Sequence, residues 1–182
     1  MTVYRCLTPA EQWRYAAHLL RLSAADRRAR FMGALADEAV LAHVKRIDWT
    51  RSEILAALVD GEVRAAVELR REQAYGGAAE LAVSVETAFQ GQGLGKTLVA
   101  RLLILARNRG VRRLSMLCLG DNRRMQAIAR RLLGRLEYEM GEVTSTIDLP
   151  LATPFTLVEE AMDRGTLPMA VLLDRLGQGR AA

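Results

Sequence analysis

A run of eight residues, Gln90-Gly91-Gln92-Gly93-Leu94-Gly95-Lys96-Thr97, combines closely spaced glycines with a lysine and a hydroxyl side chain. It lies between the apolar run 81–85 and the helix-like run 98–109, which predicts a strand, a glycine loop and a helix start. Glycines let the backbone approach an anion closely, and the unpaired N–H groups and positive dipole of a helix start face the same anion. The ligand of this loop should therefore carry phosphates.

Two well-known phosphate loops do not match this spacing. A Walker loop ending in Gly95-Lys96-Thr97 needs glycine at the position of Gln90, and the dinucleotide fingerprint needs G-x-G-x-x-G where this chain has G-x-G-x-G. The stretch 90–95 does fit Q/R-x-x-G-x-G/A. It therefore resembles the pyrophosphate loop of the GNAT superfamily of acyl-CoA-dependent N-acyltransferases.

The surroundings of the loop extend the resemblance. Residues 111–119 are predicted to form a buried strand, and Asn122 precedes a predicted helix that ends near residue 133. Strand, glycine loop, helix, strand, asparagine and helix, in this order, look like the cofactor half of the superfamily. The resemblance covers residues 3–149 and implies an α/β GNAT fold: a mixed, twisted sheet flanked by helices, splayed between its two central strands to admit coenzyme A.

Glu80 is the candidate catalytic residue. A lysine-type amine has a reference pKa of about 10.4 and is protonated near neutrality, so acetyl transfer to it needs a proton acceptor. Strand alternation places Glu80 and Ser84 on one face of residues 79–85, and Val83 and Val85 on the other. The stretch also resembles the corresponding strand start in bacterial protein-lysine acetyltransferases, where this glutamate is the general base.

Alternatives for the acid and base stay open. Glu80 could instead be a solvated strand-end carboxylate paired with an arginine, and Glu68 and Glu86 are the other candidate bases, with Glu86 expected to be exposed. Many GNAT enzymes carry a tyrosine acid seven positions after the asparagine, but this chain has Ala129 there. No acid is assigned: Tyr138 and water are the candidates, and a thiol with a pKa of about 8.5 gives a leaving group that could also depart without an acid.

The resemblance also implies a set of coenzyme A contacts. Strand backbone at Val83 and Val85 would bond the pantetheine amides, whereas Asn122 would bond the pantetheine arm, serve as a helix N-cap, or do both. Lys96 and Thr97 would add a charge and a hydroxyl to the pyrophosphate site. The predicted cofactor-binding residues are Val83, Val85, Gln90, Gly91, Gln92, Gly93, Leu94, Gly95, Lys96, Thr97 and Asn122.

The composition fits one compact domain. The chain has 182 residues, of which 51% are apolar and 26% charged. This length suffices for one well-formed core and is too short for two ordinary domains. The sequence contains no apolar run of membrane-spanning length, and residues 1–7 lack a signal pattern, so we expect a cytoplasmic protein without a membrane partner. Cys6, Cys118, His18 and His43 lack the paired spacing of zinc ligands, so no metal is expected.

The net charge of +5 does not by itself indicate a nucleic-acid partner. Basic pairs are scattered over several predicted elements, and aromatic residues make up only 5% of the chain, which leaves few platforms for stacked bases. No nucleic-acid partner is therefore expected. Basic side chains near the glycine loop could instead attract the polyanionic coenzyme A.

The other elements follow from periodicity and turn residues. Helices are expected at 9–22, 24–30 and 36–47. Strands are expected at 3–7, in a hairpin of 54–59 and 63–69, and in a closing hairpin of 135–140 and 143–149. Helices at 155–164 and 167–176 would form an extension, 150–182, packed on the acetyltransferase domain of 1–149. The extension could cover a sheet face, line the acceptor site or join two subunits of a homodimer.

The predicted function is transfer of an acetyl group from acetyl-CoA to a primary amine, by direct attack with Glu80 as the base. Residues 18–23 and 27–31 resemble the segment that borders the acceptor groove in bacterial protein-lysine acetyltransferases, which is compatible with a protein or peptide acceptor such as a protein lysine. Two alternatives remain. One is a small-amine or antibiotic acetyltransferase, and the other is a catalytically silent coenzyme A-binding sensor.

Overall fold

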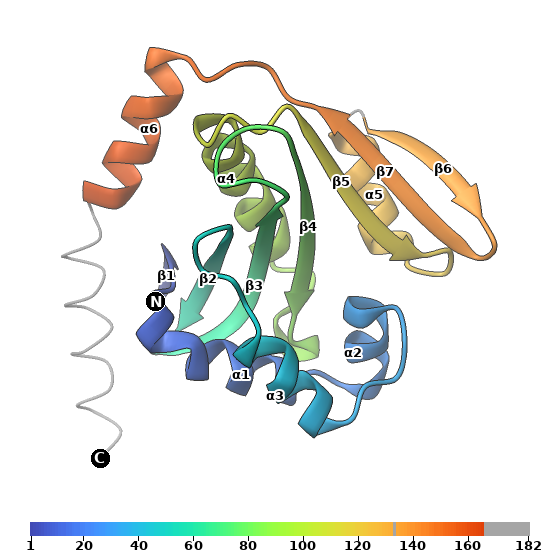
Figure 1. Cartoon of the computed structure of the whole chain (residues 1–182). Coiled ribbons are helices and arrows are strands. Elements are labelled where there is room, and N and C mark those ends of the chain that lie inside the picture. Colours follow the sequence, from blue (N-terminus) through green and yellow to red (C-terminus); the bar gives the residue numbers. More distant parts are fainter. Residues whose placement is uncertain (133, 166–182) are drawn as a thin grey trace.

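A single seven-stranded sheet organises the computed structural model, which describes residues 1–132 and 134–165 (Figure 1). The strand order is β1-β2-β3-β4-β5-β7-β6, and β4 and β5 are the one parallel pair among the described strands. The sheet is therefore mixed, as predicted. The strands are β1 (Thr2–Cys6), β2 (Ser52–Val59), β3 (Glu62–Arg71), β4 (Ala78–Val85), β5 (Arg113–Leu119), β6 (Arg135–Glu139) and β7 (Glu142–Asp148).

Helices cover both faces of the sheet (Figure 1). On one face lie α1 (Gln12–Arg21), α2 (Ala24–Phe31) and α3 (Asp37–Lys45), and on the other lie α4 (Leu94–Asn108) and α5 (Arg123–Arg131). The sixth helix, α6 (Pro154–Gly165), packs against α4. Strands β2 and β3 are buried along most of their length because helices cover them on both sides.

Two apolar clusters lie on the two faces of the sheet. Tyr15 and Leu19 of α1 pack with Val40 of α3 against one face, whereas Leu98 and Leu102 of α4 pack against the other. All five side chains are fully buried. This double-sided core fixes the positions of β3 and β4, which carry the candidate catalytic carboxylates.

Local signals in the sequence account for the element boundaries. Asp60 and Gly61 have φ angles of 50° and 80°, as a two-residue hairpin turn with two left-handed positions requires, and the β2–β3 hairpin is confirmed. Ser23 caps α2, because its Oγ accepts the Asp26 N–H at 3.1 Å. The first predicted helix begins instead as a 3₁₀ turn, Pro9–Glu11, and becomes α-helical at Gln12.

The glycine loop is shorter than predicted. Helix α4 begins at Leu94 rather than at residue 98, with Gly93 as its N-cap. Lys96 and Thr97 therefore belong to the first turn of the helix.

The expected helix at 155–164 corresponds to α6, whereas the expected helix at 167–176 lies outside the described residues. The division of the chain at residue 149 stays a prediction. In the portion of the chain that the structure describes, no helix has the length and apolar character needed to cross a bilayer.

Candidate active site

The parallel strands β4 and β5 separate after three paired positions. They pair at Ala78 with Arg113, at Ala79 with Leu114 and at Glu80 with Ser115. Beyond this point β4 continues to pair with β3 as far as Val85, while β5 diverges from it (Figure 1). Residues 81–85 of β4 therefore have no β5 partner across the β4–β5 fork, the point where the two strands separate.

A cavity of about 620 Å³ lies beside this fork and is called here the glycine-loop cavity. Its walls come from the end of β4, the glycine loop, the first turns of α4, helix α5 and one side of α2. Nine predicted cofactor residues line it: Val83, Val85, Gln90, Gly91, Gly93, Leu94, Gly95, Lys96 and Asn122. The other two, Gln92 and Thr97, are not among its lining residues, and the Gln92 side chain instead donates to the Ala88 carbonyl at 3.1 Å.

The backbone of the loop explains its glycines. Gly91 and Gly93 have φ angles of 75° and 83°, a left-handed conformation that favours glycine. A Cβ at Gly95 would lie 3.4 Å from Val85 Cγ2, an ordinary van der Waals contact, so packing against β4 does not by itself require glycine there.

The first turn of α4 is suited to an anion. The helix begins without a side-chain cap and without an acidic residue in this turn, and Lys96 lies there. Ordinary helix starts favour a capping side chain and acidic residues. The free N–H groups and the lysine charge are therefore available to a negatively charged ligand.

Gln90 connects three elements around the loop. Its amide nitrogen donates to Asp26 Oδ1 of α2 at 2.9 Å and to the Val85 carbonyl of β4 at 3.0 Å. Its amide oxygen accepts a hydrogen bond from Arg124 of α5. The glutamine at the start of the motif therefore has a structural role that needs no ligand.

Helix α2 contributes residues that the sequence analysis did not identify. Asp26 and Arg30 line the glycine-loop cavity, as do Arg124 and Arg131 of α5. The basic pairs in 123–131 were a signal for the α5 residues. For α2 there is no local signal, because Asp26 meets the loop across more than sixty residues of chain.

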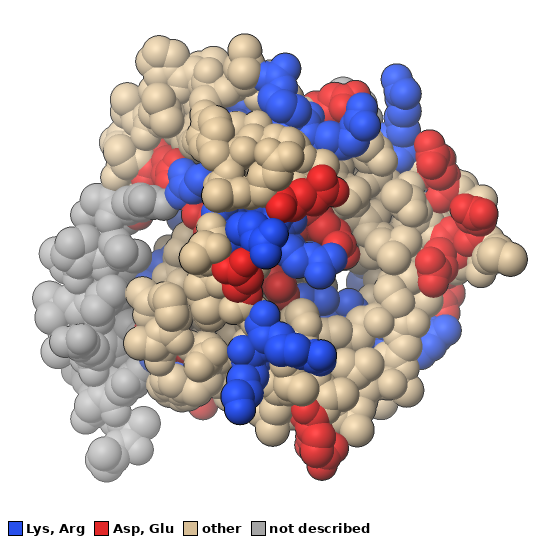
Figure 2. All heavy atoms as spheres, viewed as in Figure 1, with Lys and Arg blue, Asp and Glu red and all other residues tan. Residues whose placement is uncertain are grey.

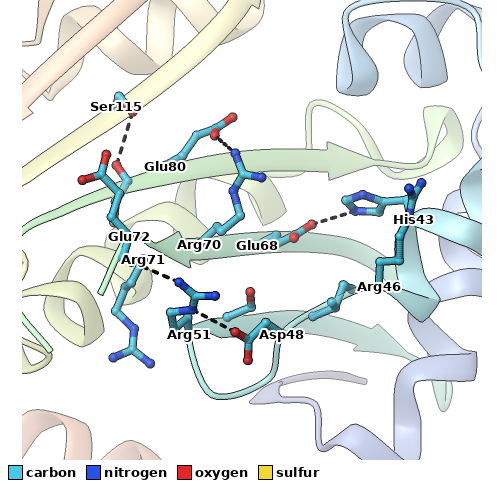
Figure 3. A pocket seen from close by; sticks show the side chains of 13 residues that line it. His43, Arg46, Asp48, Arg51, Glu68, Arg70, Arg71, Glu72, Glu80 and Ser115 are labelled. Carbon is cyan, nitrogen blue, oxygen red and sulfur yellow. Dashed lines mark hydrogen bonds and ion pairs between the residues drawn. The ribbon is translucent and has the colours of Figure 1, made fainter. Parts of the chain in front are cut away.

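A second cavity, of about 560 Å³, contains the candidate base and is called here the Glu80 cavity. It is lined by the end of α3 and the loop that follows, by the end of β3, and by the start of β4 (Figure 3). The Glu80 side chain is 42% exposed, and its Oε2 lies 2.5 Å from Arg70 Nη2. The ion pair considered from the sequence is therefore present, and the catalytic role of Glu80 stays a prediction.

Glu68 lies in the same cavity, where three groups bind one of its oxygens. Its Oε2 accepts from Tyr15 Oη at 2.9 Å and Arg30 Nη2 at 2.5 Å, and lies 3.2 Å from His43 Nε2. Burial alone would raise the pKa of Glu68, but the hydrogen bond from His43 and the charge of Arg30 outweigh it and lower the pKa to about 2. Glu68 therefore stays anionic and is a poor general base.

Glu86 is held in a similar way, and the expectation that it is exposed was wrong. Its residue exposure is 7%, and its carboxylate is 3.1 Å from His18 Nδ1, 2.9 Å from Arg21 Nε and 3.0 Å from Arg64 Nη1. Burial would raise its pKa, but these hydrogen bonds lower it below the ordinary value. Glu86 therefore fits a structural anchor between α1 and β4.

The candidate acid and the asparagine have visible structural partners. Tyr138 is 61% exposed on β6, within 3.1 Å of Arg130 Nη2, and lines neither cavity. Asn122 caps α5 by accepting the Met125 N–H at 3.2 Å, and it also lines the glycine-loop cavity. The two roles considered for Asn122 are therefore compatible in space.

Charge around the Glu80 cavity is mixed rather than acidic. Figure 2 shows basic and acidic side chains intermingled over the middle of this face of the molecule. The lining includes four arginines and four acids: Arg46, Arg51, Arg70, Arg71, Asp48, Glu68, Glu72 and Glu80. Asp48 pairs with Arg51 and Glu80 with Arg70, so several of the acids are already neutralised. Across residues 1–132 and 134–165, no group of three or more histidines, cysteines and acids is arranged to hold a metal ion.

Comparison with known proteins agrees with this architecture. The sequence model of the Acetyltransferase (GNAT) family matches residues 10–134, and the chain belongs to this family. Acetyltransferase PA5475 of Pseudomonas aeruginosa is 37% identical over 112 residues, which are 58% of this chain and 60% of that protein. The chain therefore matches only part of this curated relative.

Solved structures share the fold. The GNAT domain of S. lividans PAT superposes with a TM-score of 0.68 at 26% identity, and the match covers 80% of this chain and 89% of that domain's chain. A second structure is that of the Salmonella typhimurium protein YncA, solved with its cofactor acetyl-CoA. It superposes with a TM-score of 0.61 at 17% identity, and the match covers 84% of this chain and 96% of the YncA chain. The predicted α/β GNAT fold is confirmed.

Proposed function

We propose that this protein is an N-acetyltransferase that moves an acetyl group from acetyl-CoA to a primary amine, with a protein lysine as the leading class of acceptor. The single observation that carries the proposal is the position of the glycine-loop cavity. It extends from the α4 N-terminus to β4 beyond the β4–β5 fork, and Glu80 lies at that fork on the wall of the second cavity.

The glycine-loop cavity has the chemistry for a phosphate-bearing cosubstrate. Gly91, Gly93 and the uncapped start of α4 would bind the pyrophosphate, with Lys96 and Arg124 adding positive charge. The pantetheine arm would then extend along the free edge of residues 81–85. Its thioester would reach the fork, where the two cavities are closest along β4.

In this proposal Glu80 accepts a proton from the attacking amine. The amine would enter through the Glu80 cavity, and its nitrogen would attack the thioester carbonyl carbon as the thiolate leaves. Arg70 would hold the Glu80 carboxylate in place before the amine arrives, through the contact of 2.5 Å. Glu68 and Glu86 are less suitable bases, because each is buried, three groups bind each carboxylate, and the pKa of each is lowered.

The mixed lining of the Glu80 cavity argues for a lysine-type acceptor over a polycationic small molecule. An antibiotic with several amines would need an excess of carboxylates, but this cavity has as many arginines as acids. A single amine on a protein side chain needs only one proton acceptor and space for its methylene stem.

Measurement of thiol release from acetyl-CoA tests the proposal. A panel should include Nα-acetyl-lysine amide, lysine-bearing peptides and proteins, polyamines and aminoglycosides, each with a blank lacking enzyme. We expect turnover with lysine acceptors and little with polycations. Turnover confined to aminoglycosides would assign the small-molecule function, and coenzyme A binding without any turnover would support a silent sensor.

A further inference from the structure

Acetyl transfer to a protonated amine removes two protons from the nitrogen. An ammonium group carries three hydrogens, whereas the product amide nitrogen carries one. One of the two protons ends on the departing thiolate sulfur to give coenzyme A, and the other is released. A site that uses an ammonium acceptor therefore benefits from two proton-accepting groups, and Glu80 can serve as only one of them at a time.

The Glu80 cavity contains a second group suited to this task. His43 of α3 lines the cavity, and its side chain is 31% exposed, so the imidazole is accessible to solvent. Its Nε2 lies 3.2 Å from Glu68 Oε2, and Figure 3 shows the imidazole and the carboxylate directed toward one another. The edge of the ring also contacts Phe31, with ring centroids 5.2 Å apart.

The state of Glu68 sets the tautomer of His43. Because the pKa of Glu68 is lowered to about 2, its carboxylate is anionic and can only accept a hydrogen bond. The hydrogen of neutral His43 must then be on Nε2, which leaves the lone pair on Nδ1. No hydrogen bond to Nδ1 occurs among the described residues. A carboxylate that holds one imidazole nitrogen so that the other can accept a proton is a recurrent catalytic arrangement.

Glu68 is also held by two groups other than His43. Arg30 Nη2 at 2.5 Å already supplies a full positive charge, and Tyr15 Oη at 2.9 Å supplies a further donor. Both Glu68 and Arg30 have side-chain exposures below a tenth, 6% and 7%. The carboxylate is thus a fixed point against which the more exposed imidazole is oriented.

We propose that His43 is a second proton acceptor in the acetyl-transfer site, oriented by Glu68, and that it takes the first proton from the incoming ammonium group. The inference rests on the proposed N-acetyltransferase function. The nitrogen lone pair freed by this step attacks the thioester carbonyl carbon. Glu80 accepts the second proton, the carbon–sulfur bond breaks, and the thiolate acquires that proton. His43 then releases its proton to solvent.

Other charged and titratable groups line the Glu80 cavity together with His43 or bind Glu68 beside it, and they would also contribute to the pH dependence of the reaction. They are Tyr15 of α1, Arg30 of α2, Arg46, Asp48 and Arg51 of the segment after α3, Glu68, Arg70 and Arg71 of β3, Glu72 directly after β3, and Glu80 of β4.

The test compares His43→Gln with the wild type from pH 6.5 to 9.5, with acetyl-CoA and Nα-acetyl-lysine amide. Glutamine keeps a donor for Glu68 but cannot accept the proton. We expect kcat/KM to fall at least about tenfold near pH 7 and the difference to shrink as pH rises and free amine becomes abundant. Coenzyme A affinity should be unchanged, because His43 does not line the glycine-loop cavity. Lys45→Gln, an exposed change on the same helix, is the matched control.

A second measurement does not depend on the acceptor. Nitrogen-15 NMR of the imidazole above pH 8 should show hydrogen on Nε2 and an unprotonated Nδ1. Hydrogen on Nδ1, or identical pH–rate profiles for His43→Gln and an active wild type, would overturn the assignment and leave the proposed function standing. Absence of amine acetylation by the wild type would overturn both.

Discussion

Glu80 and Ser115 are the last residues that pair across the parallel strands β4 and β5. On one side of this pair the sheet is continuous, and on the other β4 and β5 separate beside the glycine-loop cavity. Both residues line the Glu80 cavity, and Ser115 Oγ donates to the Ala79 carbonyl at 3.3 Å. A single point in the sheet therefore carries the candidate base and the start of the free β4 edge.

Replacement of Glu80 by Gln should lower turnover with little change in structure. The two side chains have nearly the same size, but the amide cannot accept the proton, so kcat should fall by about 10²–10⁴. The loss should diminish as pH rises. Steady-state kinetics across pH measures this, with Glu142→Gln, an exposed strand glutamate outside both cavities, as control. Equal pH–rate profiles for wild type and Glu80→Gln would remove Glu80 from the mechanism.

Acid should destabilise the fold partly through Glu68. Its pKa is about 2 in the folded protein against a reference value of 4.5, so its ionised form stabilises the fold above pH 4.5. This contribution, about 3 kcal/mol, should be lost as pH falls from about 5 to 2. Urea unfolding at pH 7, 5, 4 and 3 measures the decline. Glu68→Gln should be less stable at pH 7 and show a smaller decline, and an equally steep decline in this variant would contradict the role assigned to Glu68.

The contact between α4 and α6 should depend on Asn108. Its Nδ2 donates to the Thr156 carbonyl and to Glu160 Oε2, both at 2.8 Å, and its Oδ1 accepts from Thr156 Oγ1 at 2.8 Å. Asn108→Ala removes three hydrogen bonds from the buried contact between α4 and α6 and should cost about 1–3 kcal/mol of unfolding free energy. Phe155→Ala, at a side chain that is 75% exposed on α6, is the control and should change stability by less than about 0.5 kcal/mol. A harmless Asn108→Ala would show that α6 is held in another way.

Much of the fold could be predicted because its signals are local. The Asp60-Gly61 turn, the Ser23 cap and the glycine loop each specify their own conformation within a few residues. The separation of β4 and β5 could be expected only from the family resemblance, since no local pattern in either strand encodes where pairing stops.

The surroundings of the carboxylates could not be predicted, for a physical reason. Glu86 was expected to be exposed because it precedes a loop, but His18 reaches it across 68 positions of the sequence. Glu68 is likewise held by Tyr15, 53 positions away, and by Arg30, 38 positions away. Such contacts depend on how α1 and α2 pack against the sheet. The residue types alone do not predict that packing.

Gly93→Val should weaken coenzyme A binding. The residue has a φ angle of 83°, which a β-branched side chain adopts only with strain, and the new methyl groups would project where the pyrophosphate is proposed to lie. We expect the dissociation constant to rise at least about tenfold, equivalent to about 1.4 kcal/mol. Gly33→Val is the matched control, because this glycine lacks a positive φ angle and a Cβ there would meet no atom within 4 Å. Equal losses in the two variants would point to general destabilisation rather than to the loop.

Isothermal titration calorimetry of the wild-type protein with acetyl-CoA, and separately with ATP and magnesium, directly tests whether the glycine loop binds coenzyme A. The glycine loop matches a Walker loop except at Gln90, where a Walker loop has glycine. The same residues would therefore bind either coenzyme A or magnesium ATP, and the titrations distinguish the two ligands. We expect saturable one-to-one binding of acetyl-CoA and no binding of magnesium ATP. Binding of magnesium ATP with no heat from acetyl-CoA would contradict this expectation.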